Sequence, residues 1–139
     1  MKKLISAIVC VCVVLAGTVA TGNESVSAAQ LISPFALYTA STSTSLTISS
    51  AGTATCTATL TGYSNITTKV TTYMYLQRLE NGKWVTVQSW SQTFNSHKGT
   101  LSKTHSVSKG YSYRVMASYY AYSGSASENI MGYSSTVSY

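Results

Sequence analysis

Few side chains in this sequence are of the types that carry out catalysis. The chain has two histidines, His97 and His105, a cysteine at position 56, and no aspartate. General acid–base catalysis needs titratable groups that converge, and no aspartate is present to orient either histidine. Cys56 stands on the apolar side of an alternating run, where a thiol is usually inert. We therefore expect no catalytic residue, and an enzyme built on Cys56 and the histidines is the least supported of three hypotheses.

The glutamates and the residues able to bind metals also give no support for a catalytic or metal site. Glu80 is expected opposite Lys83 beside a hairpin turn, where a cross-strand ion pair explains it. Glu128 falls in a segment rich in Ser and Gly that we expect to form a flexible turn. Two histidines and one buried cysteine lack the spacing and the fourth ligand of a zinc site. The sequence predicts neither a metal nor a cofactor.

Aromatic side chains are the better candidates for function. The chain has 11 tyrosines and two tryptophans, and such side chains supply rigid amphipathic contact area at low entropic cost. We predict a binding face on one hairpin, formed by Tyr73, Tyr75, Trp84 and Trp90. If exposed, it would stack on sugar rings or bases or accept a protein partner. The alternatives are that a neighbouring strand covers it, or that it is the core face.

The element that must position these side chains runs from Val70 to Trp90. Asn81-Gly82 between two alternating runs is the strongest short-range signal for a hairpin, because both residues tolerate positive φ. Counted from that turn, the register places Leu76 opposite Val87 and Tyr73 opposite Trp90. Because side chains alternate between faces, the predicted core face comprises Val70, Met74, Leu76, Val85 and Val87. The other face holds Tyr73, Tyr75, Leu79, Trp84 and Trp90.

Further strands flank this hairpin. Residues 53–61 alternate threonine with apolar residues, which predicts a strand whose buried side holds Ala54, Cys56, Ala58 and Leu60. Alternation also predicts strands over residues 101–107 and 111–122, the latter the longest, and less regular strands over 41–50 and 130–139. Residues 92–100 lack periodicity and are expected to form a loop. No helical period appears, so we predict an all-β, antiparallel β-sandwich.

Two resemblances refine this expectation. The segments 107–117 and 122–128 resemble the F strand and F–G turn of fibronectin type III and related immunoglobulin-like domains. The resemblance puts Tyr113 in the tyrosine-corner position, where its hydroxyl would hydrogen-bond backbone near the preceding turn. Residues 45–135 also resemble a family of small, uncharacterised secreted proteins of Gram-positive, clostridial-type bacteria. Its marks are matched here by Gly52, Ala54, Cys56, Leu76, Gln77, Trp84, Val87, Trp90 and Lys109 to Val115. That resemblance implies a fold and a compartment but no activity.

The N-terminus has the pattern of a secretory signal peptide. Lys2 and Lys3 precede an apolar run over residues 4–16, and small residues end at Ala28 and Ala29, after either of which cleavage is expected. The alternative, an uncleaved anchor, is disfavoured because a membrane span needs about 20 apolar residues. We therefore predict a signal peptide over 1–29, a flexible leader over 30–44 and one β-sandwich domain over 45–139. The mature chain is expected to be secreted and to have no transmembrane segment.

Charge supplies the remaining functional hypothesis. Of nine Lys and Arg residues, seven follow residue 29, against two glutamates there, so the mature chain carries a net charge near +5. Such a charge attracts anionic polymers, lipid or nucleic acid, although the basic residues are scattered singly, as solubility alone would require. We expect a non-catalytic binding module whose partner is a cell-wall polymer, a glycan or a protein, with no specific nucleic-acid binding. The alternative is a small cationic effector, bacteriocin-like or membrane-active.

Overall fold

The computed structural model describes residues 28–30 and 36–139. The predicted signal peptide over 1–29 lies almost wholly outside these residues and stays a prediction. The described residues form strands and no helix. The strands are β1 Ala28–Gln30, β2 Thr39–Ile48, β3 Thr53–Gly62, β4 Lys69–Glu80, β5 Lys83–Phe94, β6 Lys98–Ser106, β7 Ser112–Ser123, β8 Ala126–Tyr133 and β9 Val137–Ser138.

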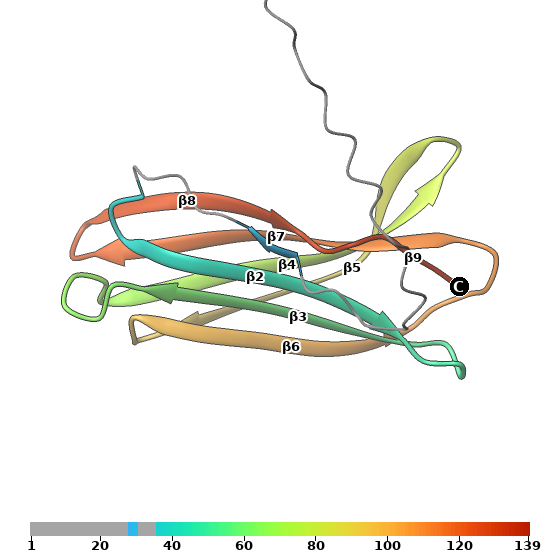
Figure 1. Cartoon of the computed structure of the whole chain (residues 1–139), viewed down its shortest axis with the longest axis horizontal. Helices are drawn as coiled ribbons and strands as arrows, with labels where there is room; N and C mark the ends of the chain where they lie inside the picture. The colour runs from blue at the N-terminus through green and yellow to red at the C-terminus, as the bar shows by residue number, and fades with distance from the viewer. Residues whose placement is uncertain (1–27, 31–35) are drawn as a thin grey trace, which may run out of the picture.

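These strands form two sheets that pack face to face (Figure 1). One has four strands in the order β1-β2-β3-β6. The other has five strands, in the order β5-β4-β7-β8 with β9 also paired to β7. All the pairings are antiparallel. The predicted all-β, antiparallel β-sandwich is confirmed.

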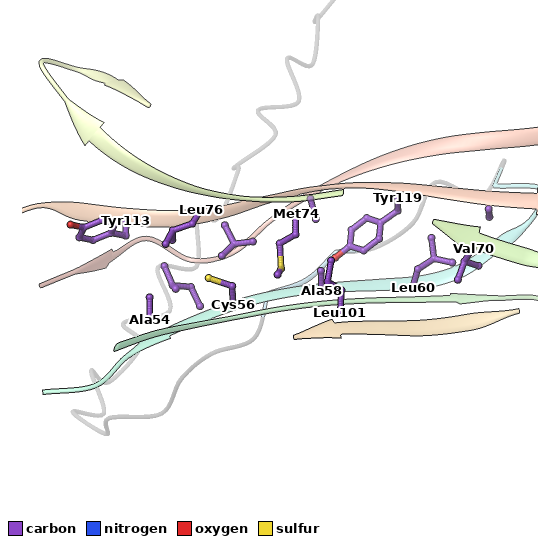
Figure 2. Packing of buried hydrophobic residues seen from close by; sticks show 14 residues of the cluster. Ala54, Cys56, Ala58, Leu60, Val70, Met74, Leu76, Leu101, Tyr113 and Tyr119 are labelled. Atoms are coloured by element: carbon purple, nitrogen blue, oxygen red, sulfur yellow. The ribbon is translucent and has the colours of Figure 1, made fainter. Parts of the chain in front are cut away.

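The core lies between the sheets and follows from the period of two in the sequence. Every second residue of β3 is buried, as predicted, and meets buried residues of β4 and β7 (Figure 2). Figure 2 shows the small side chains of β3 facing the larger ones of the opposite sheet. The fully buried residues are Ala54, Cys56, Ala58, Leu60, Val70, Met74, Leu76, Val115, Ala117, Tyr119 and Ala121.

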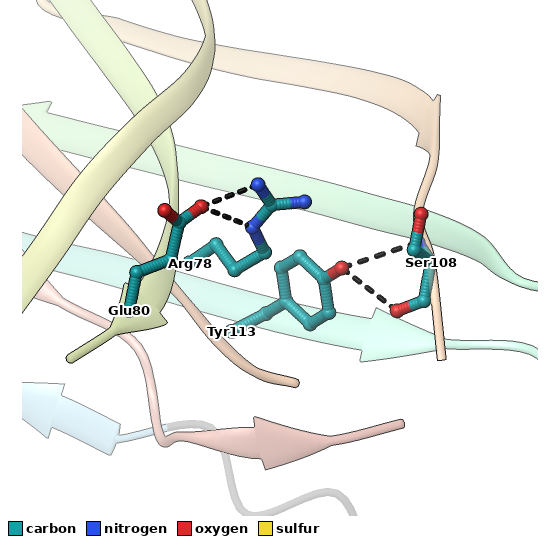
Figure 3. A network of polar contacts seen from close by, with 4 residues as sticks. All are labelled: Arg78, Glu80, Ser108 and Tyr113. Carbon is teal, nitrogen blue, oxygen red and sulfur yellow. Dashed lines mark hydrogen bonds and ion pairs between the residues drawn. The ribbon is translucent and has the colours of Figure 1, made fainter. Parts of the chain in front are cut away.

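The tyrosine corner is also confirmed. The hydroxyl of Tyr113 donates a hydrogen bond to the Ser108 carbonyl at 2.8 Å and accepts one from the Ser108 amide at 3.1 Å (Figure 3). These bonds fasten the start of β7 to the turn five residues earlier. Because Tyr113 is 1% exposed, its hydroxyl would otherwise be buried without a partner.

The prediction of a loop over residues 92–100 is wrong. Strand β5 continues to Phe94 and β6 begins at Lys98, so only residues 95–97 connect them. Hydroxyl pairs replace apolar periodicity here: Thr71 bonds Thr93 at 2.8 Å and Thr59 bonds Thr100 at 3.0 Å. Gly99 packs against the ring of Phe94, where a Cβ would come within 2.1 Å. Threonine ladders between strands are invisible to a search for apolar alternation.

The prediction of a flexible leader over 30–44 is wrong from residue 39 onward. Strand β2 begins at Thr39, and Thr39, Thr42 and Thr44 are buried. The Thr44 hydroxyl lies 2.7 Å from the hydroxyl of Tyr119, which also donates to the Ser43 carbonyl. Burial raises the pKa of Tyr119 to about 12. The buried Tyr119 therefore anchors β2. The Ser/Thr-rich composition of β2 gave no indication that this strand packs on the core.

The flexible turn predicted around Glu128 is also wrong, because Glu128 belongs to β8. Its carboxylate accepts hydrogen bonds from the backbone amides of Leu37 and Tyr38, both at 2.9 Å. Desolvation acts to raise the pKa of Glu128, but the hydrogen bonds that its carboxylate accepts outweigh it and hold that pKa below its ordinary value. Glu128 is thus a clamp on the entry to β2.

Candidate functional site

The hairpin that carries the predicted binding face forms at Asn81-Gly82, with φ of 49° and 76°. The predicted register holds from Glu80 opposite Lys83 down to Gln77 opposite Thr86. A β-bulge then shifts it by one residue, because β5 uses Val87 as an extra residue and places Gln88 opposite Leu76. The two strands keep their extended form beyond the bulge, but every later residue of β5 changes face.

The bulge removes Trp90 from the predicted face. Trp90 lies opposite Met74 rather than Tyr73, packs against the core, and meets the ring of His105 from the other sheet edge-on at 6.4 Å. The predicted core face changes too. Val85, near the hairpin tip that projects past the sandwich in Figure 1, is 42% exposed. Tyr73, Tyr75 and Trp84 remain together on the outer side of the sheet.

Strands β7 and β8 extend that outer side. In β7 the buried residues Val115, Ala117, Tyr119 and Ala121 alternate with Arg114, Met116, Ser118, Tyr120 and Tyr122, which therefore point away from the core. The register with β8 adds Asn129, Met131 and Tyr133 to the same side. We call this surface the aromatic face. Its members are Lys69, Tyr73, Tyr75, Gln77, Trp84, Arg114, Met116, Ser118, Tyr120, Tyr122, Asn129, Met131 and Tyr133.

One end of the aromatic face is organised by Arg114. Its guanidinium carbon lies 4.3 Å from the ring centroid of Trp84 and 4.8 Å from that of Tyr133. Its Nε donates a hydrogen bond at 2.9 Å to Oε1 of Gln77, which lies opposite it across β4 and β7. Stacking on a ring and a bond to a buried amide both limit the guanidinium's rotation.

Tyrosines organise the other end. Tyr73 meets Tyr120 edge-on, with ring centroids 5.8 Å apart, and Tyr120 stacks on Tyr122 at 6.4 Å. Lys69 Nζ lies 4.3 Å from the centroid of the Tyr122 ring. These contacts hold the rings in fixed relative positions at the surface, as a contact surface of low conformational entropy requires.

The aromatic face remains accessible in the part of the chain that the structure describes. The other sheet packs on the opposite side of these strands, and no described element lies across the face (Figure 1). Tyr73 and Met131 are each 40% exposed and Tyr133 is 37% exposed. These partly exposed side chains lie on the neighbouring strands β4 and β8 and their partner β7, rather than singly over the surface.

The sequence indicated only part of this face. The alternation of residues along β7 already places Arg114 and Tyr120 on the side of the strand that faces away from the core. That β7 lies beside β4, however, is a pairing between strands distant in sequence. Local pattern does not carry such information, and Arg114, Tyr120, Tyr122 and Tyr133 were missed for that reason.

Cys56 and His105, two of the residues considered for catalysis, lie on the paired strands β3 and β6. Cys56 is fully buried among apolar side chains, and desolvation raises its pKa to about 12, so its thiol stays protonated at neutral pH. Among the described residues no group of three or more His, Cys, Asp or Glu side chains could hold a metal ion. His105 lines a cavity of about 200 Å³ at one end of the sandwich, together with Arg78 and Tyr113.

Arg78 in that cavity is already neutralised. Its Nε donates to Glu80 Oε1 at 2.7 Å and its terminal nitrogen forms an ion pair with the same oxygen (Figure 3). The predicted cross-strand partner of Glu80 was Lys83, but residues two apart on one strand share a face, and Arg78 reaches the carboxylate from there. The ring of Tyr111 lies 4.4 Å from the Arg78 guanidinium and completes the cluster.

Comparison with protein-family models, with curated proteins and with solved structures finds no match for this chain. Within residues 28–30 and 36–139, the structure contains no helix long and apolar enough to cross a membrane.

Proposed function

We propose that this protein is a secreted, non-catalytic binding module that engages a glycan or wall polymer through the aromatic face. The observation that carries the proposal is the set of fixed, partly exposed rings, Tyr73, Tyr120, Tyr122 and Tyr133, on a sheet surface that no described element covers. Rings held in this way present apolar faces to a ligand and hydroxyls to its polar edges. Little entropy is lost on binding, because the ring–ring contacts already restrict them.

The proposal includes an immunoglobulin-like, fibronectin type III-like arrangement within the β-sandwich. The two packed antiparallel sheets, β2-β3-β6 against β5-β4-β7-β8, support it, since such domains are sandwiches of two antiparallel sheets. The bond between the Tyr113 hydroxyl and Ser108 supports it as well. In such domains the sandwich is a scaffold, and function lies in a surface built on it.

The experiment is a binding screen with matched variants. Purified mature protein is incubated with insoluble wall material and with immobilised neutral and acidic polysaccharides at physiological salt. Tyr73→Ser and Tyr133→Ser each remove an exposed ring of the face and are expected to weaken retention roughly tenfold. Tyr63→Ser is the control, because Tyr63 is 43% exposed but lies in the connection after β3, outside the face. Retention of nothing, or equal loss with all three variants, would exclude the proposed function.

A cationic membrane-active effector is the second candidate. Lys69 and Arg114 lie beside Tyr122 and Trp84, and this combination of charge and amphipathic rings also suits the surface of an anionic bilayer. Vesicles of phosphatidylglycerol loaded with a fluorescent dye distinguish the two. Dye release at micromolar protein that Trp84→Ala abolishes would favour the effector. Absence of release together with polysaccharide binding would favour the module.

A further inference from the structure

The two arginines of the described chain sit in similar aromatic surroundings but differ in charge balance. Each guanidinium lies against a ring, that of Arg78 against Tyr111 at 4.4 Å and that of Arg114 against Trp84 at 4.3 Å. Arg78 is paired with Glu80. Among the described residues, the hydrogen-bond partner of Arg114 is a neutral amide, that of Gln77. Arg114 therefore keeps an uncompensated positive charge at the surface.

Geometry limits how a ligand can use that charge. The ring centroids of Trp84 and Tyr133 both lie within 5 Å of the guanidinium carbon of Arg114, while Gln77 takes the Nε hydrogen. The two terminal nitrogens remain, and among the described residues no acceptor pairs with them. Their parallel N–H groups match the two oxygens of a carboxylate approaching in the guanidinium plane. A tetrahedral phosphate would also place oxygens out of that plane, toward the rings.

The charge of the whole aromatic face has one sign. It holds Arg114 and Lys69, while both acidic side chains of the described residues are engaged elsewhere, Glu80 with Arg78 and Glu128 with the amides before β2. Removal of the charge of either Arg114 or Lys69 would therefore weaken the attraction of the aromatic face for an anionic ligand. Complementarity favours a partner that carries negative charge.

The two cations are far apart, with rings between them. Arg114 lies opposite Gln77 and Lys69 opposite Tyr122, so eight residues of β4 separate the two positions. At 3.3–3.4 Å per residue this is about 27 Å. The rings of Tyr73 and Tyr120 and the amide of Asn129 occupy the interval. A ligand that spans it must be extended, must offer apolar ring faces with polar edges, and must carry repeated anionic groups.

We infer that the ligand of the aromatic face is a carboxylate-bearing polysaccharide of the uronic-acid type, and that Arg114 is the residue that recognises its carboxylate. This inference rests on the binding function proposed above and specifies its ligand. The sugar rings stack on the tyrosines, and one carboxylate takes the two terminal N–H groups of Arg114. Trp84, Tyr133 and Gln77 position the guanidinium, and Lys69 attracts a second carboxylate farther along the polymer.

The test compares polygalacturonate with its fully methyl-esterified form, which has the same backbone without the charge. Binding to the mature protein is measured by titration of tryptophan fluorescence and by affinity electrophoresis at physiological salt. Loss of a charge-assisted bidentate contact is expected to weaken binding roughly ten- to a hundredfold, both for the esterified polymer and for Arg114→Gln. Arg114→Lys is expected to recover little, because it restores the charge but not the planar pair of donors.

Lys103→Gln is the matched control for net charge, since Lys103 is an exposed residue of β6 in the other sheet. It is expected to bind polygalacturonate as the parent protein does. Chemical denaturation of each variant verifies the fold, and Gln at position 114 can still bond the amide of Gln77. An equal loss for Lys103→Gln and Arg114→Gln would overturn the inference in favour of non-specific attraction.

The outcomes also separate this inference from the proposed function. Equal binding of the acidic and esterified polymers, both weakened by Tyr73→Ser, would overturn the carboxylate assignment and leave the binding function standing. Binding of a phosphate-rich teichoic acid but not of polygalacturonate would also overturn it. Failure of the protein to bind any wall or polysaccharide sample would remove both. Preference for the acidic polymer that Arg114→Gln alone abolishes supports both.

Discussion

Gln77 lies directly opposite Arg114 across β4 and β7, and its side-chain oxygen accepts the Arg114 Nε–H at 2.9 Å. Gln77 is 7% exposed, so a neutral, buried amide holds an arginine of the outer surface that has no acidic partner among residues 28–30 and 36–139. This relationship gives the surface its charge. It also makes Gln77 the residue through which that charge can be changed with least disturbance.

Gln77→Glu is therefore expected to abolish the anion preference of the aromatic face. The new carboxylate would pair with Arg114 at the same position, and because residue 77 is buried, the cost of desolvating the carboxylate offsets part of the gain from the ion pair. Binding of polygalacturonate should fall roughly tenfold or more, since the ligand would then meet a neutral site. Gln92→Glu, on the exposed part of β5, adds the same charge elsewhere and should bind normally. Unchanged binding by Gln77→Glu would contradict the role given to Arg114.

Tyr113→Phe tests the tyrosine corner. The change removes both hydrogen bonds to Ser108 and leaves that backbone without its buried partner. Urea denaturation should show a loss of about 1–3 kcal/mol in the free energy of unfolding. Tyr111→Phe is the control, since the Tyr111 ring contacts the guanidinium of Arg78 at the surface. A similar loss for both variants would mean that the Tyr113 hydroxyl has no special role.

The Glu128 clamp predicts an acid-sensitive contribution to stability. Because hydrogen bonds hold its folded-state pKa below the ordinary glutamate value near 4.5, the contribution is fully present above that value. It is lost as pH falls through the lower, folded-state pKa. Denaturation at a series of pH values should show a decline for the parent protein in this acid range that Glu128→Gln lacks. Amide exchange at Leu37 and Tyr38 should be faster in the variant at neutral pH. Equal exchange rates would argue against the clamp.

Cys56 is expected to be unreactive in the native state. Since burial raises its pKa to about 12, a thiol reagent at pH 8 should modify it only through unfolding, and the rate should rise steeply in urea. The unfolded thiol ionises near its ordinary value of 9.0, so the stabilisation that Cys56 brings is complete below that pH and is lost as pH rises toward 12. Rapid modification in buffer alone would show that the thiol is accessible.

Much of the fold could be predicted from single strands. The apolar alternation of residues 53–61 and 111–122 is enough to place β3 and β7 and to name their buried sides, because a period of two allows one assignment of faces. The turn at Asn81-Gly82 fixed the register of the four pairs nearest to it. Where threonine pairs replaced apolar residues, as in Thr59 with Thr100, the end of β5 and the start of β6 were missed.

The candidate site was harder to predict than the fold for two physical reasons. Insertion of Val87 as a bulge depends on packing at the end of the sandwich, and it moved Trp90 from the predicted binding face to the core. The position of Arg114 between Trp84 and Tyr133 requires three strands to meet, and Tyr133 is 49 residues from Trp84 in sequence. Local sequence patterns show which residue types occur in each strand, but they do not show which of these residues lie close together in the fold.

The threonine ladders have a consequence for how the molecule would look once attached to a ligand. The outer side of the four-stranded sheet carries threonine and serine hydroxyls, several bonded to one another, such as Thr57 with Ser102 at 3.1 Å. It lies on the opposite side of the sandwich from the aromatic face. A layer of this protein adsorbed through its rings would therefore turn a largely hydroxyl-lined surface to the medium, with the wetting behaviour of a hydrated coating.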